Sequence, residues 1–230
     1  MEQGAKIGLT GNMLKIIAMV AMLIDHVGLY LFPDVTAFRA IGRIAFPIFA
    51  FMIAEGCTYT RNRLRYFLMI AGLGTLCQIV TTIAVRTLHQ GILITFSLAI
   101  AAIFLTEAVW KGQRVLYRVL AAIGLTGIAF TLLAAYLFPP FWIDYGAFGV
   151  LLPVLVYYIK GNKRKVLGMA VGIAAHALTA SVTQWCALLA IPLLFLYNGM
   201  RGKAKLKYLF YVFYPTHLVV LYLVANFFFR

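Results

Sequence analysis

Residues 14–32 read LKIIAMVAMLIDHVGLYLF, a run in which only Lys15, Asp25 and His26 carry charge or titrate near neutral pH. A helix that crosses the hydrocarbon core of a bilayer needs about 20 mostly apolar residues, and this run has that length. Asp25 and His26 stand where a signal peptide would carry small residues for cleavage, and the apolar run resumes after them. We therefore predict an uncleaved first membrane-spanning helix.

The apolar character continues along the 230-residue chain, which is 64% hydrophobic and 11% charged, with a mean hydropathy of +0.96. Soluble chains are about 45–50% apolar, so this composition excludes a water-soluble globule. The apolar windows number nine, and the eighth is short. They cover residues 14–32, 37–58, 64–85, 91–110, 115–138, 141–159, 166–182, 185–197 and 208–229.

These windows predict an all-α integral membrane protein, a polytopic bundle of about nine transmembrane helices, or eight if residues 185–197 are re-entrant. No linker or internal repeat is visible, so we expect a single domain over residues 1–230. The three cysteines show no metal-ligand spacing and lie in or beside apolar windows, and we expect no metal site.

Twenty Lys and Arg residues against six Asp and Glu give a net charge of +14. In a soluble protein this excess would suggest nucleic acid as a partner. Here the basic residues cluster in the short loops after the second, fourth, sixth and eighth windows. The positive-inside rule therefore places these loops and the amino terminus in the cytoplasm, and no nucleic-acid partner is expected.

An ionisable residue at the bilayer centre costs about 2.5–3.5 kcal/mol on insertion scales, which makes it a functional candidate by default. Asp25 and His26 lie deep in the first window, and Arg43 lies at a similar depth in the second. Since only residues 33–36 join the two windows, the helices are expected to be antiparallel neighbours. Arg43 then neutralises Asp25, and His26 stays available to handle a proton. The alternative is a buried ion pair that only fixes helix packing.

Two prolines stand beside these polar positions. Pro47 cannot donate a backbone hydrogen bond to the carbonyl of Arg43, so we expect a bend there and a wet cavity beside the guanidinium. Pro215 likewise leaves a backbone carbonyl without its helical hydrogen bond in the last window, where Tyr214 and His217 lie on one helix face. The alternatives are an ordinary proline kink and a histidine that only packs.

Four further residues each have a structural interpretation. Asp144 and Tyr145 open the sixth window, where a carboxylate is favoured by the helix dipole and needs no function. Lys15 returns to the face of His26 after eleven residues, although a lone lysine there can be a snorkelling anchor. Glu107 is expected to pair with a basic loop or to snorkel, and in both cases to be structural.

Several motifs resemble the TraX family of bacterial membrane proteins, and the likeness covers nearly the whole chain. The motifs are LKIIA at residues 14–18 followed by Asp25-His26, GRIAFPIFAF at 42–51 with AEG at 54–56, the set Thr60, Arg65 and Tyr66, DYG at 144–146 with GV at 149–150, and KYLFYVFYPTHL at 207–218.

TraX-like proteins are associated with acetylation of the amino terminus of conjugative pilin, and they look like relatives of multi-span acyltransferases. The resemblance implies a multi-pass acetyltransferase in the bacterial inner (cell) membrane, with His26 as catalytic base, Asp25 as its partner and Arg43 as a charge clamp. It implies acetyl-CoA as acyl donor. The acceptor would be a small molecule, a peptide or a pilin-like protein outside the cytoplasm.

In this hypothesis four basic residues hold the anionic groups of acetyl-CoA: Lys15, Arg61, Arg63 and Arg65. Four residues are candidates for binding the acceptor: Asp144, Tyr145, Tyr214 and His217. Arg43 or Tyr145 stabilises the oxyanion. A proton-coupled transporter is an alternative, although no inverted repeat is visible. A non-catalytic assembly factor, in which the polar pairs only organise helices, is another.

Overall fold

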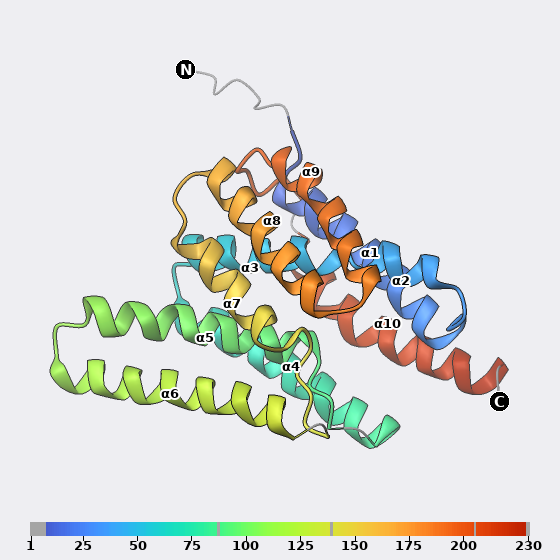
Figure 1. Ribbon diagram of the computed structural model, residues 1–230, viewed down its shortest axis with the longest axis horizontal. Coiled ribbons are helices and arrows are strands. Elements are labelled where there is room, and N and C mark those ends of the chain that lie inside the picture. The colour runs from blue at the N-terminus through green and yellow to red at the C-terminus, as the bar shows by residue number, and fades with distance from the viewer. Residues whose placement is uncertain (1–7, 87, 139, 205, 229–230) are drawn as a thin grey trace. The chain divides into compact units, whose positions relative to one another are not determined.

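The computed structural model describes residues 8–86, 88–138, 140–204 and 206–228 (Figure 1). Within these ranges the protein is helical and contains no β-strand, only two isolated bridges. The elements are α1 (Gly11–Tyr30), α2 (Thr36–Gly42), α3 (Ala45–Tyr59), α4 (Arg63–Val85), α5 (Ile92–Lys111), α6 (Val115–Leu137), α7 (Gly146–Tyr158), α8 (Asn162–Thr179), the 3₁₀ helix η1 (Val182–Leu189), α9 (Ala190–Phe195) and α10 (Lys207–Phe228).

Six segments of the described chain are long and apolar enough to cross a membrane, which agrees with the expected class of helical membrane protein. They are Gly11–Tyr30, Thr36–Tyr59, Arg63–Ile83, Ile92–Lys111, Val115–Leu137 and Leu209–Phe227.

The other three predicted windows are also helical, but each is a weaker candidate for a span. The helix α7 has 13 residues and is therefore about 20 Å long, and the segment Val182–Phe195 is similarly short. The first turn of the helix α8 contains three consecutive basic residues after Asn162, which lower its hydropathy. The count of nine transmembrane crossings, the re-entrant alternative and the orientation therefore stay predictions.

The chain divides into two compact units. The first comprises Met1–Met52 and Lys160–Arg230, and the second comprises Ile53–Ile159. The first unit holds α1, α2, the start of α3, and α8 to α10. The second holds the end of α3 and α4 to α7. The expected single domain stays a prediction.

In the first unit, α1 and α2 form a tight antiparallel pair. Thr10 caps α1 by accepting a hydrogen bond from the backbone N–H of Met13 at 3.3 Å. Small residues let the two helices approach closely: a Cβ added to Gly28 would lie 2.4 Å from the Cβ of Phe38. The chain then leaves the helical path after Gly42 and starts α3 at Ala45. The predicted interruption beside Arg43 is thus confirmed, with Pro47 in the first turn of α3, where proline is tolerated.

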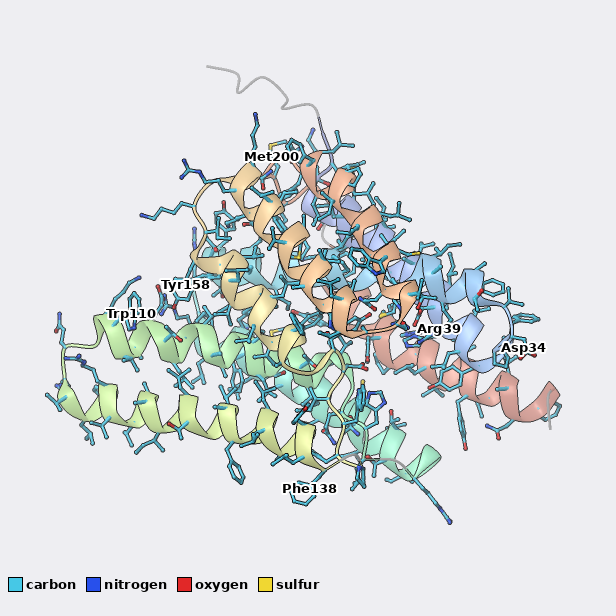
Figure 2. All side chains as sticks on the ribbon, viewed as in Figure 1. Asp34, Arg39, Trp110, Phe138, Tyr158 and Met200 are labelled. Atoms are coloured by element: carbon cyan, nitrogen blue, oxygen red, sulfur yellow. The ribbon has the colours of Figure 1, made fainter. Side chains whose placement is uncertain are left out.

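In the second unit, α5 is the central helix and packs against α4, α6 and α7. Phe96, Ile100 and Ile103 of α5 are buried, whereas in α6, described over its whole length, only Ala121 is buried. The large aromatic side chains Trp110 and Phe138 project outward at the ends of α5 and α6 (Figure 2). The exposed apolar surface of α6 fits contact with lipid on its outer face.

Candidate functional site

Asp25 and His26 are consecutive on α1, so their side chains leave the helix about 100° apart and meet different neighbours. The carboxylate of Asp25 meets α2, and the imidazole of His26 meets α10. The helix α1 packs against both of these helices. One dipeptide therefore connects two polar contacts in the first unit.

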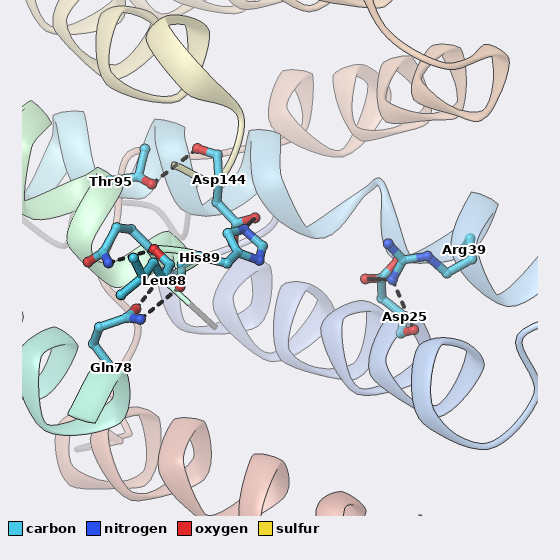
Figure 3. A network of polar contacts seen from close by, with 9 residues as sticks. Asp25, Arg39, Gln78, Leu88, His89, Thr95 and Asp144 are labelled. Atoms are coloured by element: carbon cyan, nitrogen blue, oxygen red, sulfur yellow. Dashed lines mark hydrogen bonds and ion pairs between the residues drawn. The ribbon is translucent and has the colours of Figure 1, made fainter. Parts of the chain in front are cut away.

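The first contact is an ion pair between Asp25 and Arg39, drawn at the right of Figure 3. Nη1 of Arg39 donates to Oδ2 of Asp25 and also to its backbone carbonyl oxygen, the latter at 3.3 Å. The Asp25 side chain is 16% exposed and that of Arg39 is 25% exposed. This partial burial makes the pair an anchor of α2 on α1.

The second contact joins two histidines that are 191 positions apart. Nδ1 of His26 lies 2.8 Å from Nε2 of His217, and the two rings stack with centroids 5.0 Å apart. His217 is 6% exposed, and its Nδ1 lies 2.8 Å from the backbone oxygen of Phe213. The ring of Phe213 stacks on His217 at 4.6 Å, and Tyr214 meets it edge-on at 5.6 Å. The second imidazole is thus fixed on three sides.

This geometry adds to the expectation in two respects. Arg39, which the sequence analysis did not single out, forms an ion pair with Asp25, and the expected pairing of Asp25 with Arg43 stays a prediction. Arg43 lies in the break after α2, one residue beyond the glycine that packs on Asp25. His217 and Tyr214, expected at the acceptor, lie in the same cluster as His26, with His217 in direct contact.

Lys15 lies in the first unit, on the helix that carries His26. Its Nζ sits over the ring of Phe210 at 5.5 Å from the centroid, a cation–π contact between α1 and α10. Eleven residues separate Lys15 from His26, which corresponds to roughly 17 Å along the helix.

The three arginines expected to bind the donor belong to the second unit and differ in their environments. Arg63 forms an ion pair with the buried Glu107, which also pairs with Lys111, and its guanidinium lies 5.1 Å from the ring centroid of Phe104. The expected pairing of Glu107 with basic residues is confirmed. Arg61 and Arg65 are exposed.

Asp144 and Tyr145 also belong to the second unit, where Asp144 is part of a separate polar network (Figure 3). Oδ1 of Asp144 lies 2.9 Å from Nε2 of His89, and Thr95 donates to the backbone oxygen of Asp144 at 3.1 Å. The side-chain hydrogen bond to Asp144 raises the pKa of His89 above its ordinary value. Tyr145, not Asp144, is the N-cap of α7, in a left-handed conformation with φ 58°.

Sequence reasoning missed His89 and Gln78, which complete this network. The Gln78 amide donates to the backbone oxygen of His89 at 2.7 Å and accepts from the backbone N–H of Gly91 at 3.0 Å. A glutamine inside an otherwise apolar window was the available signal, because a buried amide needs partners.

Comparisons with known proteins agree with the motifs in the sequence. A family model described as TraX protein matches residues 10–225. The uncharacterized protein RP591 of Rickettsia prowazekii is 43% identical over 72 residues, which are 31% of this chain and 27% of that protein. The probable fimbrial assembly protein FimC, serogroup H1, of Dichelobacter nodosus is 24% identical over 90% of this chain and 92% of its own length. No solved structure matches.

Proposed function

The chain belongs to the TraX family, and from this premise we propose that it is a membrane-embedded acyltransferase. It moves an acetyl group from acetyl-CoA to an amine or hydroxyl of an acceptor. The observation that carries the proposal is the imidazole of His26, held against His217 on a helix long and apolar enough to span a membrane. A histidine fixed in this way inside an apolar segment is suited to general base catalysis.

The proposed step is a direct transfer. The acceptor nitrogen or oxygen attacks the thioester carbonyl carbon and loses its proton to His26. A carbon–nitrogen or carbon–oxygen bond forms, and the carbon–sulfur bond breaks. The leaving thiolate then takes the proton from His26, so the products are the acetylated acceptor and free CoA. General base catalysis of this kind contributes typically 100- to 10,000-fold in rate.

The charged neighbours of His26 have supporting roles in this proposal. The ion pair of Asp25 with Arg39 anchors α1 on α2 and so fixes the backbone from which His26 projects. A basic group at the α2–α3 break is suited to stabilise the oxyanion that develops on the carbonyl, and we assign this role to Arg43.

For the donor, the exposed Arg61 and Arg65 are the better candidates to hold the phosphates of acetyl-CoA, because Arg63 is already engaged by Glu107. Lys15 is a further candidate in the first unit, on the helix of His26. We propose a bacterial inner-membrane location and, because one relative is named as a fimbrial assembly protein, a pilin-like or peptide acceptor.

The test compares membranes that contain the wild-type protein, the variant His26→Gln or no protein. Radiolabelled acetyl-CoA is supplied, label in membrane proteins and small molecules is counted, and the acetylated product is identified by mass spectrometry. We expect label transfer with the wild type and a loss of about 100-fold or more with His26→Gln. The control is Thr126→Val, a change of an exposed residue of α6 outside the proposed machinery. Equal transfer by His26→Gln, at equal protein level, would discard the proposal.

The name of the fimbrial relative favours one other function, a non-catalytic assembly factor. In that case the polar cluster only organises helices, and a double variant Asp25→Asn, His26→Gln keeps its biological activity. Membranes would then show no acetylation that depends on the protein. Substrate flux into proteoliposomes without acetyl-CoA would instead indicate a transporter.

A further inference from the structure

The hydrogen bonds of the histidine pair determine which ring nitrogens carry protons. A backbone carbonyl oxygen only accepts, so Nδ1 of His217, 2.8 Å from the oxygen of Phe213, carries a hydrogen. A neutral imidazole has a single N–H, and Nε2 of His217 is therefore an acceptor. A cationic ring at this depth would need a nearby carboxylate, and Asp25 is engaged by Arg39.

The same reasoning fixes the tautomer of His26. Because Nε2 of His217 accepts, Nδ1 of His26 must donate across the 2.8 Å contact. A neutral His26 then has no hydrogen on Nε2, which carries the lone pair. No residue in the described part of the chain forms a hydrogen bond with this nitrogen, and the His26 side chain is only partly buried.

We propose that His217 is a positioning residue that fixes His26 as the Nδ1–H tautomer, so that Nε2 of His26 is the atom that accepts the acceptor's proton. Its role matches that of the carboxylate that orients the histidine in a Ser-His-Asp triad. The catalytic part of this inference rests on the proposed acyl transfer, whereas the tautomer does not.

The arrangement also prepares the pair for the charge that develops during transfer. When Nε2 of His26 takes a proton, its Nδ1–H bond to His217 becomes charge-assisted and stronger. The stacked ring of Phe213 and the edge-on ring of Tyr214 keep His217 from rotating away. Charged and titratable groups near the pair include Asp25, Arg39, Tyr30 and Tyr214.

The tautomer is measured directly by nitrogen-15 NMR of the full-length protein in detergent, labelled with [¹⁵N]histidine, with His26→Gln used to assign the signals. The proposal expects a protonated Nδ1 and an unprotonated Nε2 for His26 in the wild type. The opposite tautomer would overturn it. This measurement needs no variant of His217, so it stands even if such variants fold poorly.

Two variants of His217 then test the catalytic consequence. His217→Gln keeps a side-chain oxygen that can accept from Nδ1 of His26, and we expect the wild-type tautomer and a rate within about tenfold. His217→Leu removes the acceptor, and we expect mixed tautomers and a rate lower by roughly 100- to 10,000-fold. The apparent KM for acetyl-CoA stays unchanged in both, because His217 does not touch the donor.

The outcomes separate this inference from the proposed function. Wild-type transfer by folded His217→Leu would overturn the positioning role and leave acyl transfer intact. Absence of transfer in wild-type membranes would overturn the acyltransferase, while the NMR signals of His26 would still decide the tautomer.

Discussion

A β-carbon on Gly42 would lie 2.1 Å from Oδ1 of Asp25, because the carboxylate of α1 packs directly on the backbone of α2. No side chain fits in that space unless one helix moves. The glycine thus sets the separation at which Arg39, three residues earlier on α2, reaches the same carboxylate. Close approach through a small residue is a common way for membrane helices to associate.

We expect Gly42→Ala to lower the free energy of unfolding by about 1–3 kcal/mol, the usual cost of overpacking. The measurement is thermal or denaturant unfolding in detergent. Gly127→Ala is the matched control, since an added Cβ there meets no atom within 4 Å and lies in a regular helix. The control is expected to be unchanged or more stable by about 0.4–1 kcal/mol. Equal stability of the two variants would contradict the close packing of Asp25 on α2.

A second prediction concerns the ion pair itself. Asp25→Asn or Arg39→Leu alone should lower the free energy of unfolding by about 1–3 kcal/mol, because the remaining charge keeps its desolvation cost without its partner. The double variant should lose less than the sum of the single losses. A double-mutant cycle by thermal unfolding measures this coupling, and additive losses would show that the two side chains do not interact.

The fold class and the positions of most helices could be predicted because hydrophobicity over about 20 residues is a local property of the sequence. The pairing of Asp25 with Arg39 could not be predicted. Similar depth in the first two windows suggested Arg43 as the partner, whereas the packing of Gly42 on the carboxylate puts Arg39 within reach along α2. A glycine whose missing side chain accommodates a distant carboxylate gives no signal in a single sequence.

The contact of His26 with His217 was beyond sequence reasoning for a different reason. Both residues were recognised as polar positions inside apolar windows, but nothing local indicates that the first and last helices are neighbours. Asp144 could not be fully predicted for the same reason. Its position before a helix suggested an interaction with the helix dipole, whereas its carboxylate contacts His89 from another loop. Such pairings depend on tertiary packing across long stretches of chain.

The third prediction separates donor binding from stability among the basic residues of the second unit. The double variant Arg61→Ala, Arg65→Ala should raise the apparent KM for acetyl-CoA about tenfold with kcat unchanged, since two charge-assisted contacts to phosphate are lost. Because both residues are exposed, the effect should shrink as salt is added.

Arg63→Ala is the comparison for that experiment. It removes a basic partner of the buried Glu107, so we expect it to lower the unfolding temperature more than the double variant does. If only Arg63→Ala raised the KM for acetyl-CoA, Arg63 would be the donor-binding residue in place of Arg61 and Arg65.

The last prediction is a pH dependence of stability from the pair of His89 and Asp144, which lies outside the helices that can span a membrane. The hydrogen bond to Asp144 raises the pKa of His89 in the folded state above the ordinary value of 6.5. The protonated form is thus favoured by folding. Its contribution is fully present below about pH 6.5 and is lost as the pH rises through the raised pKa of the folded state.

The measurement is the unfolding temperature of the wild type and of Asp144→Asn in detergent between about pH 5.5 and 8.5. The unfolding temperature of the wild type should exceed that of Asp144→Asn most at the acid end of this range. The difference should shrink toward the alkaline end, because neutral His89 no longer attracts the carboxylate. His89→Gln, which cannot titrate, should remove this pH dependence when combined with Asp144→Asn. An advantage that grows with pH would mean that His89 and Asp144 do not form the charged pair.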